Sequence, residues 1–465
     1  MAKHYHLIGI GGIGMGALAS LLLDKGCKVS GSDVKENELT IILKKKGAKI
    51  FSSHHVENIS GANCVVYSSA IKFTNPEMIE AVSSHIPVLK RAELLAELVN
   101  QEIGITVAGA HGKTTTTSMV SHVLLQAGLK PTTAVGGIIN STTTAYNANL
   151  GTGTYFVAEA DESDGTFLYF KPMYSIITNI DFEHVDFYKN WDNIIAAYRK
   201  FIQRTNPEGC LIVCGEDPRL KQLACEEKIP TLTYGVHSDF DVYATQVVVA
   251  GYSSKFNCHY KGQLLGEVRL VVPGRHNVLN ALAAIALGLR LNVPFEKIAQ
   301  ALKTFSGVKR RFQLKGDFND ILVVDDYGHH PTEIIATLSA AKSFGKKRLV
   351  VVFQPHRYSR TKLLMDEFVK SLELSDYLIL TDVYAAGEKP GDGADAQELY
   401  SKIQQRYGAG AIFIPRENIL PHLLESVRPG DMVVTLGAGD VTQLSDQLVA
   451  KWQANHPVVQ KQRVS

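Results

Sequence analysis

A short glycine-rich loop, Gly109-Ala110-His111-Gly112-Lys113-Thr114, constrains this chain more than any other feature. Ile105 and Val107 before it predict a short buried strand, and apolar residues after it recur at helical spacing until Gly128, a predicted helix C-cap. A strand, a glycine loop and a helix in this order build a site for nucleotide phosphates, because the loop amides and the helix N-terminus face the anion. The sequence therefore predicts an α/β domain that binds a nucleoside triphosphate.

The loop is shorter than the general P-loop pattern, since Val107 stands where that pattern has its first glycine. A chance match in a surface turn is the alternative, and the flanking strand and helix argue against it. We expect Lys113 to neutralise charge near the β,γ-bridge of the triphosphate and the Thr114 hydroxyl to bind Mg²⁺. The loop residues expected to bind the nucleotide are Gly109, His111, Gly112, Lys113, Thr114 and Thr115.

Composition excludes several classes of protein. The chain has 465 residues, enough for several domains, and its net charge of +2 with no long basic run argues against a nucleic-acid surface. Its six cysteines are scattered and form no C-x-x-C pair, which indicates free thiols rather than zinc ligands or disulfides.

The uncharged stretch from Leu7 to Leu23 resembles a signal peptide or membrane anchor. Its five glycines make it a poor hydrophobic helix, and no other apolar segment is long enough to span a bilayer. We therefore expect a soluble, cytoplasmic protein with no membrane partner.

Residues 1–100 alternate predicted strands with helices, which indicates a parallel, Rossmann-like sheet. The predicted strands are 4–10, 28–32, 48–51 and 64–67, and the predicted helices are 14–25 and 38–46. Gly9-x-Gly11-x-x-Gly14 follows the first strand, and Asp33 ends the second. This is the dinucleotide fingerprint, but its glycines only provide close approach to a diphosphate, so a nucleotide-sugar diphosphate fits as well as NAD.

Residues 101–308 carry acidic motifs at predicted strand ends. The strand that begins at Tyr155 ends in Glu159-Ala-Asp161-Glu162, and the strand 174–180 leads to Asp181-Phe-Glu183-His184. Clustered acids on a loop are usually a solvated turn, but strand ends beside a phosphate loop are where ligands bind in α/β sheets. We therefore predict metal binding by Glu159 and His184.

A third series of strands and helices follows a boundary near Val308. Its predicted strands are 321–324, 348–353, 377–380, 411–414 and 432–436. We predict an α/β protein of three domains: a Rossmann-like domain (1–100), a central P-loop ATPase-type domain (101–308) and a C-terminal Rossmann-like domain (309–465).

The order of the motifs resembles the Mur ligases of peptidoglycan synthesis over the whole chain. The residues that carry the resemblance are Gly109 to Thr116, Glu159 to Asp164, Gly274 to Ala284 and Arg310-Arg311-Phe312. Asp325 to Glu333, Gln354 to Thr361 and the N-terminal Gly-Ile-Gly-Gly-Ile-Gly-Met are similar to the alanine-adding branch. Murein peptide ligase ranks second, because it lacks the Pro-His-Arg-Tyr character of Gln354 to Thr361.

The resemblance implies a ligase in which the lactyl carboxylate of UDP-N-acetylmuramate attacks the γ-phosphate of ATP and L-alanine displaces phosphate from the acyl phosphate. It implies Mg²⁺, one ion or two and replaceable by Mn²⁺, with small-molecule substrates as the partners. Whether the amino acid is L-alanine, glycine or L-serine stays open, and so does the choice between a monomer and a weak dimer.

The resemblance also implies the roles of individual residues. Thr114, Glu159 and His184 would hold metal. Lys113, His184, Arg311, Asp326 and His329 would be catalytic, with Arg311 reaching the γ-phosphate. Asn277 and Asn280 would lie near the nucleotide base. The UDP-sugar would bind Gly11, Gly12, Ile13, Gly14, Asp33, Ser69 and Arg91, and the amino acid His329, His356, Arg357 and Arg360.

Structural alternatives exist for several of these residues. Asn277 and Asn280 could cap a helix, Arg310 and Arg311 could form a solvated linker, and Arg357 and Arg360 could be exposed charges on the first turn of a helix. His54 and His55 are expected at the surface, and Lys200 receives no role although several Mur ligases use a carbamylated lysine in this region.

Two other classes of function compete. An NAD-dependent oxidoreductase would explain the first glycine motif and Asp33, but it leaves the phosphate loop and the acidic strand ends unexplained. A non-enzymatic, ATP-gated binding module would need no cluster of acids and histidine around the nucleotide.

Overall fold

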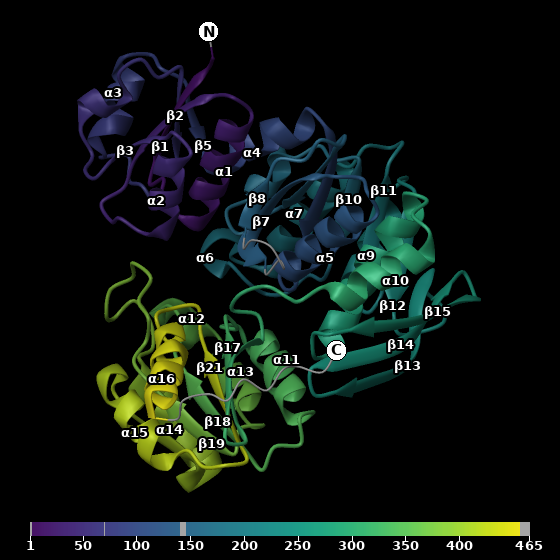
Figure 1. The fold of residues 1–465 in the computed structure, drawn as a ribbon, viewed down its shortest axis with the longest axis vertical. Helices are drawn as coiled ribbons and strands as arrows, with labels where there is room; N and C mark the ends of the chain where they lie inside the picture. The colour runs from purple at the N-terminus through teal and green to yellow at the C-terminus, as the bar shows by residue number, and fades with distance from the viewer. Residues whose placement is uncertain (1, 69, 140–145, 456–465) are drawn as a thin grey trace. The chain divides into compact units, whose positions relative to one another are not determined.

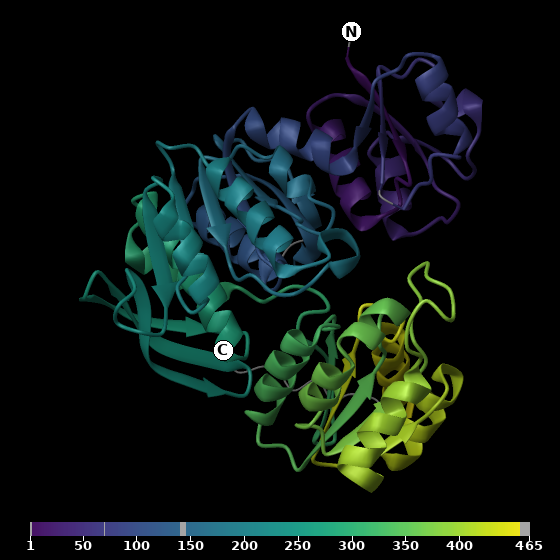
Figure 2. The same ribbon diagram turned by 180° about the vertical axis from the view of Figure 1, so that it is seen from behind.

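The structure, a computed structural model, describes residues 2–68, 70–139 and 146–455. Within these ranges the strands form three sheets, and the α/β fold with one sheet in each third of the chain confirms the predicted class (Figures 1 and 2). The chain divides into two compact units. Unit 1 comprises Met1–Val247, Lys255–Leu270 and Val278–Val308, and unit 2 comprises Val248–Ser254, Val271–Asn277 and Lys309–Ser465.

The N-terminal sheet of unit 1 is parallel and has the strand order β3-β2-β1-β4-β5. Its strands are β1 (His4–Ile8), β2 (Lys28–Ser32), β3 (Lys49–Phe51), β4 (Cys64–Tyr67) and β5 (Val88–Lys90). Its helices are α1 (Ile13–Asp24), α2 (Glu38–Lys45), the short 3-10 helix η1 (Val56–Ile59), α3 (Pro76–Ser83) and α4 (Arg91–Asn100). The predicted strands and helices lie within two residues of these bounds, whereas β5, α3 and α4 were not predicted.

The central sheet of unit 1 has the order β15-β14-β13-β12-β11-β10-β6-β9-β7-β8. Its first part contains β6 (Ile103–Ala108), α5 (Lys113–Gln126), β7 (Thr132–Ile139), β8 (Tyr146–Asn149), β9 (Tyr155–Glu159), η2 (Thr166–Tyr169), β10 (Tyr174–Ile177), α6 (Val185–Tyr188) and α7 (Trp191–Gln203). Then follow β11 (Cys210–Cys214), α8 (Pro218–Glu226), β12 (Thr231–Gly235), β13 (Val242–Ala250), β14 (Ser253–Tyr260), β15 (Gln263–Leu270), α9 (Arg275–Arg290) and α10 (Phe295–Thr304).

The register of this sheet brings the acidic motifs to the phosphate loop. β6 pairs in parallel with both β9 and β10, so that Val107 lies beside Glu159 and Ala108 beside Ile177. The carboxyl ends of the three strands therefore meet at one edge of the sheet, as the sequence predicted. β10 ends at Ile177 and not at Ile180, which leaves a longer loop before His184 than the sequence suggested.

The C-terminal sheet of unit 2 has the order β16-β17-β21-β18-β19-β20 and is parallel except for β16, which is antiparallel to β17. Its strands are β16 (Gln313–Phe318), β17 (Ile321–Asp326), β18 (Arg348–Phe353), β19 (Tyr377–Leu380), β20 (Ala411–Phe413) and β21 (Asp431–Leu436). Its helices are α11 (Pro331–Lys342), α12 (Tyr358–Leu363), α13 (Met365–Ser371), α14 (Ala396–Tyr407), η3 (Gly408–Gly410), η4 (Arg416–Asn418), α15 (Ile419–Ser426) and α16 (Thr442–Asn455). β16 was not predicted.

The remaining features concern the length of the helices and the burial of the cysteine thiols. Among the described residues, no helix combines the length and apolar character needed to cross a bilayer. The thiols of Cys64, Cys210, Cys214 and Cys258 are buried, whereas Cys225 is exposed. The boundaries predicted for the three domains stay a prediction.

Candidate active site

The phosphate loop between β6 and α5 requires its two glycines. Gly109 and Gly112 have φ values of +130° and +82°, which side chains rarely adopt. A Cβ at Gly109 would lie 2.1 Å from the Thr178 hydroxyl, and one at Gly112 would lie 2.7 Å from the Asn280 amide oxygen. The loop therefore packs too closely against its neighbours to accept a side chain at either position.

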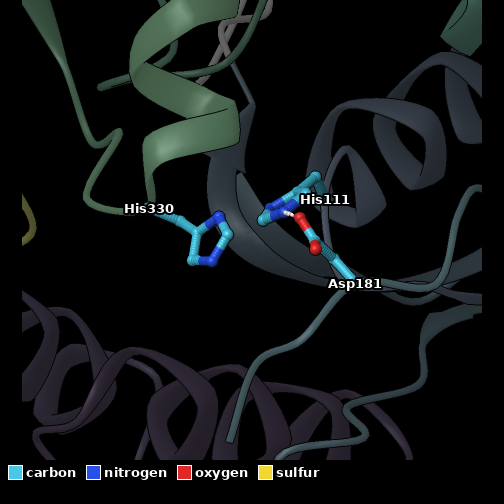
Figure 3. A group of neighbouring side chains, drawn as sticks. All are labelled: His111, Asp181 and His330. Atoms are coloured by element: carbon cyan, nitrogen blue, oxygen red, sulfur yellow. Dashed lines mark hydrogen bonds and ion pairs between the residues drawn. The ribbon is translucent and has the colours of Figure 1, made fainter. Parts of the chain in front are cut away.

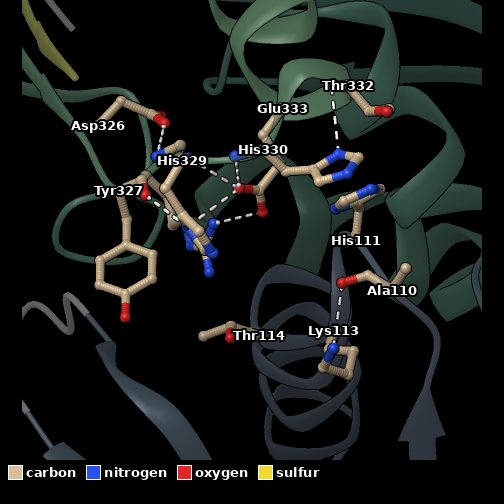
Figure 4. Close-up of polar contacts among 12 residues, drawn as sticks. Ala110, His111, Lys113, Thr114, Asp326, Tyr327, His329, His330, Thr332 and Glu333 are labelled. Atoms are coloured by element: carbon tan, nitrogen blue, oxygen red, sulfur yellow. Dashed lines mark hydrogen bonds and ion pairs between the residues drawn. The ribbon is translucent and has the colours of Figure 1, made fainter. Parts of the chain in front are cut away.

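Lys113, the first residue of α5, is held over the loop. Its Nζ donates to the carbonyl of Ala110 at 3.1 Å (Figure 4). It also donates to the Gly109 carbonyl at 2.6 Å and to Glu162 Oε1 at 2.9 Å. Burial alone would lower the pKa of Lys113, but the carboxylates of Glu162, Asp161 and Glu159 raise it. The amine is therefore a fixed positive charge at the N-terminus of the helix.

Thr114 and Glu159 meet beside this charge. The Thr114 hydroxyl lies 3.1 Å and 3.0 Å from the two carboxylate oxygens of Glu159, and the Gly136 amide donates to Glu159 Oε2 at 2.9 Å. Burial raises the pKa of Glu159. A hydroxyl and a carboxylate are ligands that Mg²⁺ prefers, so this pair fits the predicted metal position.

A second acidic cluster surrounds His184. Its Nε2 lies 3.5 Å from Glu162 Oε1 and 3.9 Å from Glu183 Oε2, and the backbone at His184 has a φ of +54°. Burial opposes protonation of His184, but the hydrogen bond to Glu162 and the charge of Glu183 raise its pKa. Glu162 Oε2 is buried and accepts no hydrogen bond from the described residues. This carboxylate oxygen and the neighbouring ligand types suit a divalent cation.

His111 of the phosphate loop is hydrogen-bonded to the loop that follows β10. Its Nε2 lies 2.7 Å from Asp181 Oδ2 (Figure 3), and its amide donates to the Asn179 side chain at 2.9 Å. The side-chain Nδ2 of Asn179 donates in turn to the backbone carbonyl of His111 at 3.0 Å. The loop after β10 therefore fixes the conformation of the phosphate loop.

Asp33 and Asn37 form hydrogen bonds with the glycine loop after β1. The Gly11 amide donates to Asp33 Oδ2 at 2.9 Å, and Asn37 Nδ2 donates to the Gly11 carbonyl at 3.0 Å. Gly12 and Ile13 lead into α1, and Ile13 is exposed. Ser69, also predicted to bind the UDP-sugar, lies outside the described residues.

A small cavity connects this loop with the central sheet. It has a volume of about 80 Å³, and its lining includes Gly14 of α1 and Arg91 of α4 together with Glu159 and Asp161. The structure therefore brings two of the residues predicted to bind the UDP-sugar, Gly14 and Arg91, and one predicted metal ligand, Glu159, to one cavity within unit 1.

The two asparagines of α9 occupy different environments. Asn280 is buried, and its Oδ1 accepts from the Thr116 hydroxyl at 3.1 Å. Asn277, at the start of the helix, donates through Nδ2 to the Pro273 carbonyl at 2.7 Å. Neither contact is a helix N-cap, since both residues lie inside Arg275–Arg290.

In unit 2, the side chains of Arg310 and Arg311 both lie against the ring of Tyr327. The guanidinium groups of Arg310 and Arg311 lie 4.8 Å and 5.0 Å from the Tyr327 ring centre, and Arg310 also donates to the Gly437 and Gly439 carbonyls. These contacts rule out the alternative of a solvated linker for Arg310. Arg311 Nη1 lies 3.5 Å from Glu333 Oε1.

Asp326 ends β17 and is buried. Its carboxylate accepts from the Phe312 amide at 2.6 Å and the Gly328 amide at 2.7 Å. Burial raises the pKa of Asp326 to about 6, despite the opposing charge of Arg311. Asp326 therefore fixes the segment that carries Arg311.

The predicted amino-acid residues form one cluster. The rings of His329 and His356 lie 5.5 Å apart, and Arg360 Nη1 lies 3.1 Å from His356 Nδ1. Burial and the charges of His329, Arg360 and Arg357 lower the pKa of His356 to about 3, so this imidazole is neutral. Arg357, with a φ of +69°, is the N-cap residue of α12. Arg357 and Arg360 are both partly buried, which disfavours the alternative of two fully exposed charges.

The sequence did not single out several residues of these clusters. Glu162 and Glu183 were visible as acids at strand ends, but nothing in the pattern assigned them to His184. Glu333 accepts from the His329 amide at 3.1 Å, and Tyr384 stacks on His356 with ring centres 5.7 Å apart. Tyr384 carried no sequence signal, whereas Glu333 follows the His-His-Pro motif at capping-box spacing. His54, predicted at the surface, is partly exposed, but its Nδ1 also lies 2.9 Å from the Ser32 hydroxyl and 3.2 Å from buried Glu77. His55 is exposed, as predicted.

Comparisons with known proteins agree with this arrangement. Three family models match in order: the Mur ligase family catalytic domain (residues 4–103), the Mur ligase middle domain (107–288) and the Mur ligase glutamate ligase domain (310–439). The UDP-N-acetylmuramate–L-alanine ligase of Geotalea uraniireducens is 49% identical over 447 residues, 96% of this chain and 97% of the relative. That of Pelotomaculum thermopropionicum is 44% identical over 98% of this chain and 99% of the relative.

Solved structures give the same result for the fold. The UDP-N-acetylmuramate-alanine ligase of Thermotoga maritima superposes with a TM-score of 0.83 at 32% identity, covering 98% of this chain and all of that one. A murein peptide ligase from Psychrobacter arcticus has a TM-score of 0.72 at 26% identity, covering 97% of this chain and 99% of that one.

Proposed function

The chain belongs to the Mur ligase family, and from that premise we propose that it joins L-alanine to the lactyl carboxylate of UDP-N-acetylmuramate in a reaction driven by ATP. A carboxylate oxygen attacks the γ-phosphorus, and ADP leaves. The amine of L-alanine then attacks the carbonyl carbon of the acyl phosphate, loses a proton and displaces inorganic phosphate. The product is UDP-N-acetylmuramoyl-L-alanine, an intermediate of peptidoglycan biosynthesis in the cytoplasm.

The observation that carries this proposal is the cavity in unit 1. Gly14 and Arg91 line it together with Glu159 and Asp161. A UDP-sugar whose diphosphate binds the loop after β1 would therefore extend toward the acids beside Lys113. An oxidoreductase would have no use for this connection, since hydride transfer needs no phosphate loop or acidic strand ends.

Lys113 would offset the repulsion between a carboxylate and a triphosphate. Its amine is fixed by Gly109, Ala110 and Glu162, so it needs little reorganisation when the phosphates bind. Thr114 and Glu159 would hold one Mg²⁺, and His184 with Glu162 and Glu183 a second, with Mn²⁺ as a substitute. A bound cation supplies positive charge to the phosphates. Asn277 and Asn280, both on α9, would lie near the nucleotide base, and Arg311 would bind the γ-phosphate.

Unit 2 would bind the amino acid. Arg357 and Arg360 offer charged donors for its carboxylate, and a planar guanidinium can hold a carboxylate through two hydrogen bonds. His329 is oriented by Glu333, so its ring can accept the proton that the amine loses. His356, whose pKa is lowered to about 3, stays neutral and is too weak a base for this step. We assign residues 1–100 to the UDP-sugar, 101–308 to ATP and 309–465 to the amino acid.

Phosphate release measured with each substrate omitted in turn tests the function. We expect release only when ATP, UDP-N-acetylmuramate and L-alanine are all present, with a product whose mass has increased by one alanyl residue. A panel with glycine, L-serine and the peptide substrate of murein peptide ligases separates the candidates. Turnover with the peptide but not with L-alanine would contradict the proposal.

A further inference from the structure

A buried polar network in the N-terminal sheet has no place in the proposed chemistry. Glu77 of α3 is fully buried, and its carboxylate accepts from the Ser32 hydroxyl at 2.6 Å and from Asn58 Nδ2 at 2.6 Å. His54 Nδ1 lies 3.2 Å from one of its oxygens, and the Nε2 of His6, also fully buried, lies 3.6 Å from the other. A buried carboxylate with donors from β1, β2, η1 and the segment after β3 ties these elements to α3.

The hydrogen bonds fix where the protons lie. His4 Nδ1 lies 2.9 Å from the Gly61 carbonyl, which can only accept, so Nδ1 carries the proton. Burial lowers the pKa of His4, so its Nε2 is bare and accepts from the Ser30 hydroxyl at 2.8 Å. Ser30 has only one proton to give. His6 Nδ1, 2.9 Å from the same hydroxyl oxygen, must therefore donate.

The second nitrogen of His6 then faces Glu77. If Nε2 were bare, its lone pair would point at a carboxylate oxygen 3.6 Å away in a site closed to water. Burial opposes ionisation of Glu77, but the interaction with His6 and the hydrogen bonds from Ser32 and Asn58 lower its pKa to about 2. The carboxylate is therefore charged, and a proton on His6 Nε2 would place an opposite charge 3.6 Å from it.

Ser32 connects this network to the glycine loop. Its hydroxyl donates to Glu77, and its carbonyl accepts from the amides of Gly9 at 2.8 Å and Ile10 at 3.1 Å. The next residue, Asp33, accepts from the Gly11 amide. The first three residues of the loop are thus held by two consecutive residues, one of which is bonded to Glu77.

We propose that Glu77 is a positioning residue for the glycine loop after β1, acting through Ser32 as a carboxylate paired with a doubly protonated His6. This inference rests on the proposed function in taking that loop as the diphosphate site. Glu77 touches no substrate. It sets the position of Ser32, and through it the amides that would face the diphosphate.

The protonation state can be tested without turnover. In protein labelled with ¹⁵N-histidine, we expect ring resonances near neutral pH that show protons on both nitrogens of one buried histidine, and we expect this signal to be lost in His6→Asn. Resonances that show a single ring proton on His6 would overturn the ion pair.

The positioning role is tested by calorimetry. We expect Glu77→Gln to raise the Kd for UDP-N-acetylmuramate about tenfold while leaving the Kd for ATP unchanged. Glu80→Gln, on the same helix but outside the network, should bind like the wild type. Ser32→Ala, which removes only the hydroxyl, should reproduce the effect and serves if Glu77→Gln does not fold. Unchanged UDP-sugar binding in Glu77→Gln or Ser32→Ala, or an equal loss of ATP binding, would overturn the inference, whereas a wild type that binds no UDP-sugar would refute the proposed function instead.

Discussion

The strongest prediction for a single residue concerns Lys113, because it is a partly buried cation whose charge is stabilised by several carboxylates, Glu162 foremost. Replacing it with alanine removes the charge that would offset the approach of a carboxylate to ATP. We expect Lys113→Ala to lower kcat by about a hundredfold to a thousandfold. Binding of UDP-N-acetylmuramate, measured by calorimetry, should stay near the wild-type value, since the glycine loop after β1 is intact.

Lys171→Ala is the matched control for this variant, since Lys171 is an exposed lysine of the same unit. It should turn over like the wild type. Near-native turnover in Lys113→Ala would show that the phosphate loop is assigned wrongly.

A variant of Arg360 tests the proposed amino-acid site in the same way. Its guanidinium already lies against His356, and loss of one charge-assisted contact to the substrate carboxylate costs about 1.5 to 3 kcal/mol. Arg360→Ala should therefore raise the KM for L-alanine about tenfold to a hundredfold, with little change in the KM for ATP or the UDP-sugar. Lys362→Ala, exposed on the same helix, is the control. A rise in the KM for ATP instead would refute the amino-acid site in unit 2.

Among the elements, the hydrogen-bond network around Glu77 should make the stability of the N-terminal sheet depend on pH. The pKa of Glu77 is about 2 in the folded protein, against an ordinary value of 4.5 for the glutamate side chain, so its ionisation stabilises the fold above pH 4.5. This contribution, on the order of 3 kcal/mol, is lost as the pH falls from 4.5 to 2. His6 and His54 face the carboxylate, and His4 lies beyond Ser30.

Urea unfolding at a series of pH values measures this effect. We expect the unfolding free energy of the wild type to fall more steeply below pH 4.5 than that of Glu77→Gln. Parallel curves for the two proteins would show that the Glu77 carboxylate is not the group responsible.

The elements show where sequence reasoning succeeds. β2, β4, β18 and β19 were predicted at their observed bounds. The last three are short apolar runs between turn signals, as buried parallel strands commonly are. β16 was missed, since only its last residue is buried and the strand has no continuous apolar run. Its position depends on antiparallel pairing with β17, which local sequence does not encode.

The candidate site, too, was predicted only in part from the sequence. Lys113, Thr114 and Glu159 follow from a loop and a strand end that must meet in a parallel sheet. The partners of His184 and the stacking of Tyr384 on His356 depend on tertiary packing. The contact of His54 with Glu77 was not predicted, because Glu77 is distant in sequence and belongs to a helix that was not predicted.

For the whole molecule, the central claim is that the lactyl carboxylate becomes an acyl phosphate. The most direct measurement uses UDP-N-acetylmuramate labelled with ¹⁸O in that carboxylate, with L-alanine, ATP and mass spectrometry of the released phosphate. We expect one ¹⁸O in each phosphate, since the oxygen that attacks the γ-phosphorus leaves with it. Phosphate that contains only oxygen from ATP and water would show that the lactyl carboxylate does not form an acyl phosphate.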